Sequence, residues 1–317
     1  MIKEDIMVSV ICMTYNHGPY IRNALDGFVS QKTSFMYEVI VHDDASTDNT
    51  VEIIREYEKK YPHIIKPIYQ TENQYSKGVN ASQVFIHPLV RGKYIALCEG
   101  DDYWTDSLKL QKQVDVMEQH PEVDICAHTV SMIDSKSKKK VGEIKPTNKV
   151  GILSLSMVIE GGGAFVSTNS LLYRRELMDS PPYFREKCPL DYALQIQGAM
   201  RGGMLYLTDN MAVYRVAVPG SWTDRVSNSK YYITQAEMIK RMLDRVNECT
   251  QYKYDLIIQK QKRKLDFASL EVNGEYKKLK EYLYRDLYNE KPLKWKVKLF
   301  IKKYFSNLIG IYKERKK

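Results

Sequence analysis

Three carboxylates crowd into four consecutive positions and could bind a cation together. They are Glu99, Asp101 and Asp102, with Gly100 after the first. The apolar run 94–98 precedes them and has the length and composition of a buried strand. Like charges at the end of a buried strand repel one another and resist desolvation, so another group must compensate them. A hard divalent cation such as Mg²⁺ does so and often keeps phosphate oxygens among its ligands. The alternative, a solvated acidic turn, is disfavoured by that strand and by the aromatic pair 103–104 that follows.

A second acidic pair, Asp43–Asp44, follows another strand-like run, 37–42. The loop after the first strand-like run, 7–13, reads Thr14-Tyr15-Asn16. Carboxylates accept hydrogen bonds from a uracil N–H or from ribose hydroxyls, and the Tyr15 ring can stack on a base. An acidic pair in a loop is usually solvated. Two acidic strand ends in one sheet nevertheless favour a nucleotide site.

Strand-like and helical segments alternate through most of the chain, which predicts an α/β fold with a mixed, mostly parallel central sheet. The expected strands are 7–13, 37–42, 64–69, 94–98, 123–133, 170–173, 204–208 and 212–215. The expected helices are 20–31, 81–91, 108–119, 153–159, 191–201 and one capped by Ser46 or Thr47 that ends near residue 60. Residues 134–150 are rich in lysine and serine and are expected to form a mobile hairpin or loop, whereas the pattern from residue 231 onward is helical. Polar residues follow the predicted strands, where open α/β sheets bind ligands.

The segment Glu99-Gly100-Asp101-Asp102-Tyr103-Trp104 resembles the metal-binding Asp-x-Asp region of the inverting family-2 glycosyltransferases of the bacterial surface-polysaccharide type. The resemblance runs from about Val8 to Trp222 and implies a GT-A domain over 1–226, followed by a helical region over 227–317. Many family members have Asp where this chain has Glu99. Glutamate can also reach a metal or a ribose hydroxyl.

The resemblance implies a nucleotide-sugar donor, expected to be a UDP-sugar. The implied nucleotide-sugar-binding residues are Thr14, Tyr15, Asn16, Asp43, Asp44, Glu99, Gly100, Asp102 and Trp222. Asp101 is the implied ligand for Mn²⁺ or Mg²⁺, which would offset the charge of the departing nucleoside diphosphate. Trp222 would stack on a sugar or close as a lid; the alternative is packing against the C-terminal helices.

Inverting transfer needs a carboxylate that takes the proton of the acceptor hydroxyl. Asp191, in Pro189-Leu190-Asp191-Tyr192, matches the family's base, and Glu186 is the reserve candidate. The alternative for Asp191 is a helix N-cap. A helix N-terminus lowers a carboxyl pKa, so base strength would have to come from desolvation.

Two further segments bear on the resemblance. Many family members have a histidine shortly after a Tyr-Arg pair, and here Ala217 stands at that place after Tyr214–Arg215. Arg215 could touch a phosphate or form a structural salt bridge. The glycines 161–163, with residues 168–170, resemble the segment that lines the sugar pocket, although a plain flexible loop fits them equally well.

The net charge of +9 is concentrated at the C-terminus: residues 291–317 hold ten basic residues and one acid. Apolar residues recur there at helical spacing, which favours a basic amphipathic helix in peripheral contact with an anionic membrane. The alternative is a helix packed on its own domain. A membrane contact would suit a lipid-linked oligosaccharide or surface-glycan acceptor. Nucleic acid is not expected as a partner, since basic residues do not spread over the main domain.

The five cysteines are widely separated and form no Cys-x-x-Cys pair, which predicts buried thiols in a reducing compartment. Without a signal-like or membrane-spanning stretch, the expected location is cytoplasmic, with peripheral attachment at the inner face of the plasma membrane. A dehydrogenase is disfavoured because the first loop has one glycine, Gly18. A sugar-phosphate nucleotidyltransferase would need a glycine-rich loop with Arg and Lys. A non-catalytic nucleotide-sugar-binding module is supported only by the missing histidine.

Overall fold

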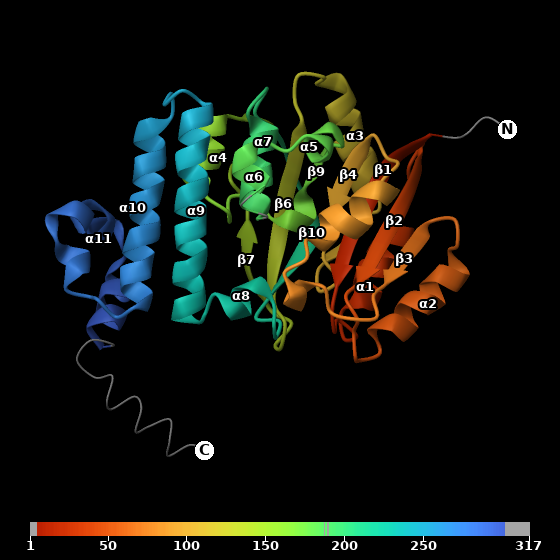
Figure 1. Ribbon diagram of the computed structural model, residues 1–317, viewed down its shortest axis with the longest axis horizontal. Helices are drawn as coiled ribbons and strands as arrows, with labels where there is room; N and C mark the ends of the chain where they lie inside the picture. The colour runs from red at the N-terminus through yellow and green to blue at the C-terminus, as the bar shows by residue number, and fades with distance from the viewer. Residues whose placement is uncertain (1–4, 187, 189, 302–317) are drawn as a thin grey trace, which may run out of the picture. The chain divides into compact units, whose positions relative to one another are not determined.

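The computed structural model describes residues 5–186, 188 and 190–301, and the chain divides into two compact units, Met1–Thr223 and Asp224–Lys317. The sequence-based boundary lies three residues later, after residue 226. The first unit is a mixed α/β structure, and the described part of the second consists of helices and turns (Figure 1). The predicted fold class, a GT-A-like α/β domain with a C-terminal helical region, is confirmed.

The first unit contains a ten-stranded sheet in its described residues, with the order β3-β2-β1-β4-β9-β6-β10-β5, and with β7 added to β6 and β8 to β10 (Figure 1). The strands are β1 (Ile6–Thr14), β2 (Met36–Asp43), β3 (Ile65–Tyr69), β4 (Tyr94–Leu97), β5 (Tyr103–Trp104), β6 (Ile125–Asp134), β7 (Lys140–Ile144), β8 (Gly151–Leu153), β9 (Leu172–Arg174) and β10 (Met204–Val216).

Helices and single helical turns connect these strands. Those of the first unit are α1 (Ile21–Val29), α2 (Thr50–Lys60), η1 (Tyr75–Lys77), the π-helical η2 (Ser82–Ile86), η3 (His87–Leu89), α3 (Lys109–Gln119), α4 (Leu155–Gly161), η4 (Thr168–Ser170), α5 (Glu176–Asp179), α6 (Tyr183–Glu186) and α7 (Asp191–Ala199). Helix α8 (Trp222–Arg225) spans the unit boundary. The second unit has α9 (Ser229–Cys249), α10 (Asp255–Val272), η5 (Lys278–Lys280), η6 (Tyr282–Tyr284) and α11 (Arg285–Glu290).

Strand direction decides which side chains share an edge of the sheet. Strand β1 pairs in parallel with β2 and with β4, and Thr14 stands directly opposite Asp43. The carboxyl ends of these three strands therefore lie together. Strand β9 runs antiparallel to β4 and to β6, so its beginning, and η4 just before it, lie at that same edge.

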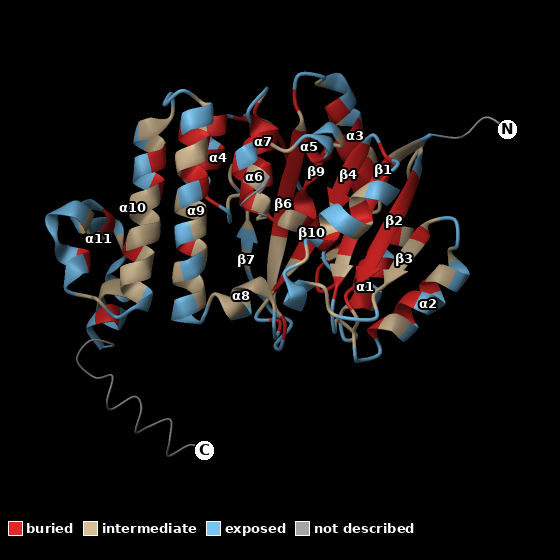
Figure 2. Cartoon of the chain, viewed as in Figure 1, coloured by how far each residue is buried: buried red, intermediate tan, exposed pale blue. Residues whose placement is uncertain are grey.

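The core of the first unit is centred on β1, β2 and β4, which are almost entirely buried (Figure 2). Such strands are covered on both faces and read as continuous apolar runs, which is why the sequence predicted them well. Helix α1 buries Leu25 and Phe28, and the Phe28 ring meets Trp104 edge-on with centroids 4.8 Å apart. This contact secures the segment that follows the acidic cluster.

Two predicted helical segments differ from the structure. The segment 81–91 is a π-helical turn followed by a 3₁₀ turn, because Pro88 lacks an N–H and restricts the residue before it. The helix expected to be capped by Ser46 or Thr47 begins instead at Thr50. There the Asp48 carboxylate accepts from the Thr50 N–H at 3.0 Å, and Ser46 is engaged by Asp43.

The strand predictions also need correction in two places. The two strands expected at 204–208 and 212–215 are one strand, β10, whose pairing with β6 shifts register around Asn210. A bulge of this kind bends a strand without ending it. The acidic turn contains the short strand β5, which pairs antiparallel with β10. The Lys/Ser-rich segment 134–150 does form a hairpin, in which β7 pairs with β6.

The second unit has a small apolar cluster of its own, in which the Trp295 ring stacks on Phe267 with centroids 5.9 Å apart. Within the described ranges, no helix combines the length and apolarity needed to cross a bilayer. Four of the five cysteines are buried free thiols, as predicted, whereas Cys249 is exposed.

Candidate active site

The loop after β1 and the loop after β2 are tied together by hydrogen bonds. The Ser46 hydroxyl donates to Asp43 Oδ1 at 2.5 Å and accepts from the Asn16 N–H at 2.8 Å. Asn16 Oδ1 in turn accepts from the Thr47 N–H at 2.7 Å. Asn16 and Ala45 both have positive φ angles, 54° and 62°. These contacts bring the predicted residues Asn16 and Asp43 into one preformed structure.

Asp44 has different contacts from its neighbour Asp43. Its two carboxylate oxygens accept hydrogen bonds from the backbone N–H groups of Gln74, at 2.7 Å, and Tyr75, at 3.0 Å. Asp44 therefore holds the loop that follows β3. A direct contact with a nucleotide remains a prediction for this residue.

Gly100 lets the end of β4 approach the loop after β1 closely. Its N–H donates to the Met13 carbonyl at 2.9 Å, and a Cβ at this position would lie 2.7 Å from Thr14 Oγ1 and 2.9 Å from His17 Nδ1. Thr14 is buried, whereas the Tyr15 side chain is 44% exposed and presents its ring for stacking. The structure thus brings together the first loop and the acidic cluster.

Asp101 and Asp102 are both buried but differ in their partners. Among the described residues, the Asp101 carboxylate accepts no hydrogen bond. Asp102 Oδ1 accepts from the Arg215 N–H at 2.8 Å, and its Oδ2 accepts from Asn169 Nδ2 at 3.1 Å. Burial, followed by the charge of Asp101, raises the pKa of Asp102 well above its ordinary value. Asp102 therefore links β10 to η4, while Asp101 keeps its oxygens free for a ligand.

The Arg215 guanidinium is buried and holds the acidic cluster from beside it. It donates to the Asp101 carbonyl and to Asn23 Oδ1, the latter at 2.6 Å, and lies 4.4 Å from the centroid of the Tyr103 ring. Burial lowers the pKa of Arg215. Among the described residues Arg215 forms no salt bridge, and its contacts are those of a buried support for Asp101; a phosphate contact stays a prediction.

His17, to which the sequence analysis assigned no role, lies between the two acidic strand ends. Burial lowers its pKa, and the carboxylates of Asp101, Asp48 and Asp43 act in the opposite direction. One imidazole therefore senses carboxylates from both strand ends. Its place directly after the Thr14–Asn16 loop was the signal that could have identified it.

Asp191 is the first residue of α7, and its Oδ2 accepts from the Thr168 hydroxyl. The N-cap is Leu190, so the N-cap alternative for Asp191 is wrong. Burial raises the pKa of the Asp191 carboxyl, and the Thr168 hydrogen bond partly offsets this effect. Since Thr168 and Asn169 are consecutive in η4, one turn joins Asp191 to Asp102.

The remaining predicted residues lie around this edge. Glu99 is exposed, and Trp222 begins α8. The next residue, Thr223, is hydrogen-bonded to Tyr214, whose pKa is raised by burial and then by Asp102 and Glu99.

Three other segments named in the sequence analysis can be located as well. Ala217 has a φ of 59°, and its carbonyl accepts from the Ser135 hydroxyl at 2.8 Å. A Cβ on Gly163 would lie 3.4 Å from Tyr192, which places the glycine segment beside α7. The reserve base Glu186 is the last residue of α6.

No group of three or more His, Cys, Asp or Glu side chains converges on a metal position within the described part of the chain. A protein-only cage of the zinc type is therefore not formed by these residues. Mg²⁺ and Mn²⁺ can be held by one or two carboxylates that substrate phosphates and water complete. The free carboxylate of Asp101 fits that second kind of site.

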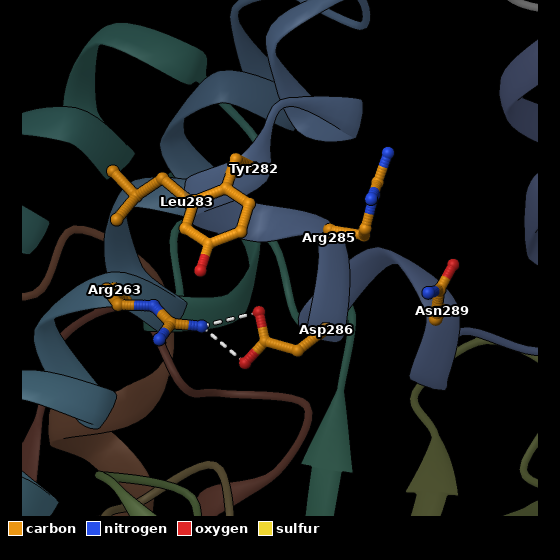
Figure 3. A pocket seen from close by; sticks show the side chains of 6 residues that line it. All are labelled: Arg263, Tyr282, Leu283, Arg285, Asp286 and Asn289. Atoms are coloured by element: carbon orange, nitrogen blue, oxygen red, sulfur yellow. Dashed lines mark hydrogen bonds and ion pairs between the residues drawn. The ribbon is translucent and has the colours of Figure 1, made fainter.

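A hollow of about 440 Å³ is lined by residues of the second unit only, among them Arg263, Tyr282 and Asp286 (Figure 3). There the Arg263 guanidinium donates to both oxygens of Asp286, while Arg285 extends away from that pair. The hollow contains none of the predicted site residues.

Comparisons with known proteins identify the family of this chain. Residues 9–180 match the family described as Glycosyl transferase family 2. Asp43 and Asp101 lie inside the matched range, and Asp191 and Trp222 lie beyond it. A protein of Mycobacterium tuberculosis named Uncharacterized protein Rv1520 is 40% identical over 249 residues, which cover 76% of this chain and 69% of the relative. The Escherichia coli UDP-Glc:alpha-D-GlcNAc-diphosphoundecaprenol beta-1,3-glucosyltransferase WfaP is 33% identical over 112 residues, 35% of this chain and 41% of the relative.

Two solved structures share the fold. S. aureus TarS 1–349 in complex with UDP-GlcNAc superposes with a TM-score of 0.54 at 17% identity and covers 84% of this chain and 81% of that one. The mannosyltransferase PcManGT from Pyrobaculum calidifontis, in complex with GDP-Man and Mn²⁺, gives a TM-score of 0.53 at 16% identity and covers 96% and 88%.

Proposed function

Because the chain belongs to glycosyl transferase family 2, we propose that it moves a sugar with inversion from a UDP-sugar to a hydroxyl of a surface glycan or lipid-linked oligosaccharide. The observation that carries the proposal is the arrangement of the acidic groups at one edge of the sheet. Asp43 and Asp101 both act on His17, and η4 bonds to Asp102 and Asp191 through consecutive residues.

The proposed donor site lies where β1 and β2 end. Asp43 and Asn16 are held in place before any ligand arrives, which reduces the entropy lost on binding. The exposed Tyr15 ring would stack on the base. A UDP-linked donor is supported by the names of WfaP and of the TarS complex, which contain UDP-Glc and UDP-GlcNAc.

Asp101 is the proposed protein ligand of Mn²⁺ or Mg²⁺, with Glu99 close by in the chain. When bound, the cation would offset negative charge on the departing nucleoside diphosphate. The support for this assignment is the unbonded Asp101 carboxylate and the Mn²⁺ in the PcManGT complex. The Arg215 guanidinium donates to the Asp101 carbonyl. This bond fixes the backbone of Asp101 and so limits the positions that its carboxylate can take.

Asp191 is the proposed general base. The acceptor oxygen forms a bond to the anomeric carbon as the bond from that carbon to the diphosphate breaks, and the proton of the acceptor hydroxyl passes to Asp191. The raised pKa of the buried carboxyl strengthens it as a base. The Thr168 hydroxyl donates to Oδ2 and so fixes one oxygen of the carboxylate.

The proposed acceptor side involves a membrane. WfaP is named for an acceptor that carries a diphosphoundecaprenol. Residues 293–301 are helical and expose Leu293, Val297 and Phe300 beside Lys294 and Lys298. Such a surface fits peripheral contact with the anionic inner face of the plasma membrane. The rest of the predicted amphipathic segment, 302–317, lies outside the described residues.

A donor screen tests the proposal. UDP-glucose, UDP-GlcNAc, UDP-galactose and GDP-mannose are incubated with the protein, with and without Mn²⁺, and the released nucleoside diphosphate is measured. We expect Mn²⁺-dependent release from a UDP-sugar and a loss of about 10²- to 10⁴-fold in Asp191→Asn, the usual contribution of a general base.

Asp179→Asn is the matched control, since Asp179 is an exposed aspartate that pairs with His87. Tight donor binding without release would instead favour a non-catalytic binding module. Formation of a nucleotide-sugar from a sugar phosphate and UTP would favour a nucleotidyltransferase.

A further inference from the structure

Lys109, the first residue of α3, is a buried lysine at the centre of the first unit. Its ammonium donates to Gln113 Oε1 at 2.7 Å and lies 4.0 Å from the centroid of the Trp104 ring. No carboxylate among the described residues forms an ion pair with it, and Cys98 and Cys126 are the titratable groups that act on it. Burial lowers the pKa of Lys109 to about 7.

An ammonium group in this position is costly for stability. A buried charge without a counter-charge loses its hydration, and replacement of buried charges by apolar side chains of similar size is often neutral or stabilising. The ring face and one amide oxygen offset only part of that loss. A methionine would fill the same volume, so packing alone does not account for a lysine here.

Both partners of the ammonium hold η4. Trp104 Nε1 donates to the Asn169 carbonyl at 3.0 Å, and Gln113 Nε2 donates to the Ser170 carbonyl at 2.8 Å. The first residue of the same turn, Thr168, donates to Asp191. Lys109 therefore connects to the proposed base through two parallel routes that meet in η4.

The ammonium also decides the orientation of the Gln113 amide. In its protonated form Lys109 is a donor only, so the amide oxygen faces Lys109 and the amide nitrogen faces Ser170. Without the ammonium the amide can rotate and place its oxygen against the Ser170 carbonyl. That arrangement would repel η4 instead of holding it.

We propose that Lys109 is a positioning residue for Asp191, acting through Trp104 and Gln113 on η4, so that the Thr168 hydroxyl stays directed at the carboxylate. The inference rests on the proposed function, because it takes Asp191 as the base.

Lys109→Met tests the inference against Lys112→Met. Lys112 lies on the same helix, but it is partly exposed and pairs with Asp106 and Asp209. In Lys109→Met we expect kcat for nucleoside diphosphate release to fall by about 10- to 100-fold, since small misplacements of reacting groups have effects of this size. The KM for the UDP-sugar should stay within about twofold and the Tm should be unchanged or higher.

In Lys112→Met we expect kcat and KM to stay within about twofold of the wild-type values and Tm to stay within a few degrees. An unchanged kcat in Lys109→Met overturns the proposal. A lower kcat accompanied by a lower Tm and a higher KM also overturns it, because that pattern indicates a general packing role.

A double-mutant cycle with Thr168→Val asks whether the effect passes through η4. If it does, Lys109→Met should reduce kcat little further once the Thr168 hydroxyl is absent. Losses that multiply independently would overturn the route.

Hydrogen exchange supplies a measurement that needs no substrate. The N–H groups of Ser170 and Leu171 donate to the Ser167 and Thr168 carbonyls inside this turn. In Lys109→Met these two N–H groups should exchange with solvent at least about tenfold faster than in the wild-type protein, while the amides of β1 remain protected. Unchanged exchange overturns the proposal. Should the wild-type protein release no diphosphate from any donor, the proposed function fails, and this measurement still decides whether Lys109 holds η4.

Discussion

The ends of β2 and β4 each carry two adjacent aspartates, and in each pair the two carboxylates have different surroundings. Both carboxylate oxygens of Asp44 accept hydrogen bonds from backbone N–H groups. Those of Asp102 accept from one backbone N–H group and from one side-chain amide. Asp43 and Asp101 precede them. Asp43 likewise has both oxygens bonded, by the N–H and the hydroxyl of Ser46. Asp101 lies in a turn closed by the hydrogen bond from the Asp102 N–H to the Glu99 carbonyl, and its carboxylate alone among the four has no bond to the described residues.

The two ends differ in how complete they are without a ligand. Asp43 already accepts two hydrogen bonds from Ser46, whereas the Asp101 carboxylate accepts none from the described residues. The β2 end is joined to the loops after β1 and β3, whereas the β4 end is joined through Asp102 to η4. The donor side is therefore preformed, and the β4 end couples an incoming cation and diphosphate to the base.

The largest effect expected from this comparison is that of Asp101→Asn. Removal of the free carboxylate should lower kcat for diphosphate release by about 10²- to 10³-fold, the usual value of one group that offsets charge in the transition state. The Tm should not fall, since that carboxylate bonds to no described group. In Asp43→Asn the donor KM should rise instead. Equal effects on kcat and KM in both variants would contradict the distinction between the two ends.

The next effect is on stability and separates the two supports. Asp102→Ala should lower the free energy of unfolding by about 3 kcal/mol, because it leaves the buried Arg215 N–H without an acceptor and removes one of the two acceptors of the buried Asn169 amide. Asp44→Ala should lower it by about 1 kcal/mol, since the Tyr75 end of its contacts is exposed to water. Urea unfolding measures both. A larger loss for Asp44→Ala would show that the β2 end is the more tightly supported one.

Gly100→Ala should cost about 2 kcal/mol, because the new methyl group would press on Thr14 Oγ1 and His17 Nδ1. At the end of β2 a substitution in the loop should have the opposite effect on stability. Ala45 has a positive φ, so Ala45→Gly should raise the free energy of unfolding by less than about 1 kcal/mol. Thermal unfolding of the two variants checks the opposite signs; a stable Gly100→Ala protein would mean that the loop after β1 can move away.

The last prediction is a pH dependence that belongs to the β4 end. The folded-state pKa of Asp102 is raised, so between the unfolded-state and folded-state pKa values the folded protein binds one more proton. Stability from this group is therefore present at low pH and is lost as pH rises, by up to about 1.4 kcal/mol per pH unit. The wild-type stability minus that of Asp102→Asn should fall as pH rises from about 4.

The Asp101 charge is the second cause of that raised pKa. Asp101→Asn removes that charge. It should consequently narrow the pH range over which the stability difference between the protein with Asp102 and its Asp102→Asn variant changes. If this stability difference does not depend on pH, the pKa of Asp102 is the same in the folded and the unfolded protein.

Sequence patterns predicted the strands that position the site, because β1, β2 and β4 are buried on both faces and read as apolar runs. The same patterns could not separate the aspartates within a pair. Asp102 differs from Asp101 only through partners on β10 and η4, which are more than sixty residues away in the chain. Lys109 escaped attention for the same reason, since a lysine at a helix start is ordinarily exposed and only the packed structure reveals its burial.

The reversed direction of β9 has a further consequence. The antiparallel register, in which Tyr94 stands opposite Arg174 and Ala96 opposite Leu172, sets how far the turn before β9 stands from the end of β4, and the Leu97 N–H donates to the Leu171 carbonyl at 3.2 Å. The gap between the proposed leaving-group site and the proposed proton acceptor is thus a property of the sheet, and no surface loop sets it.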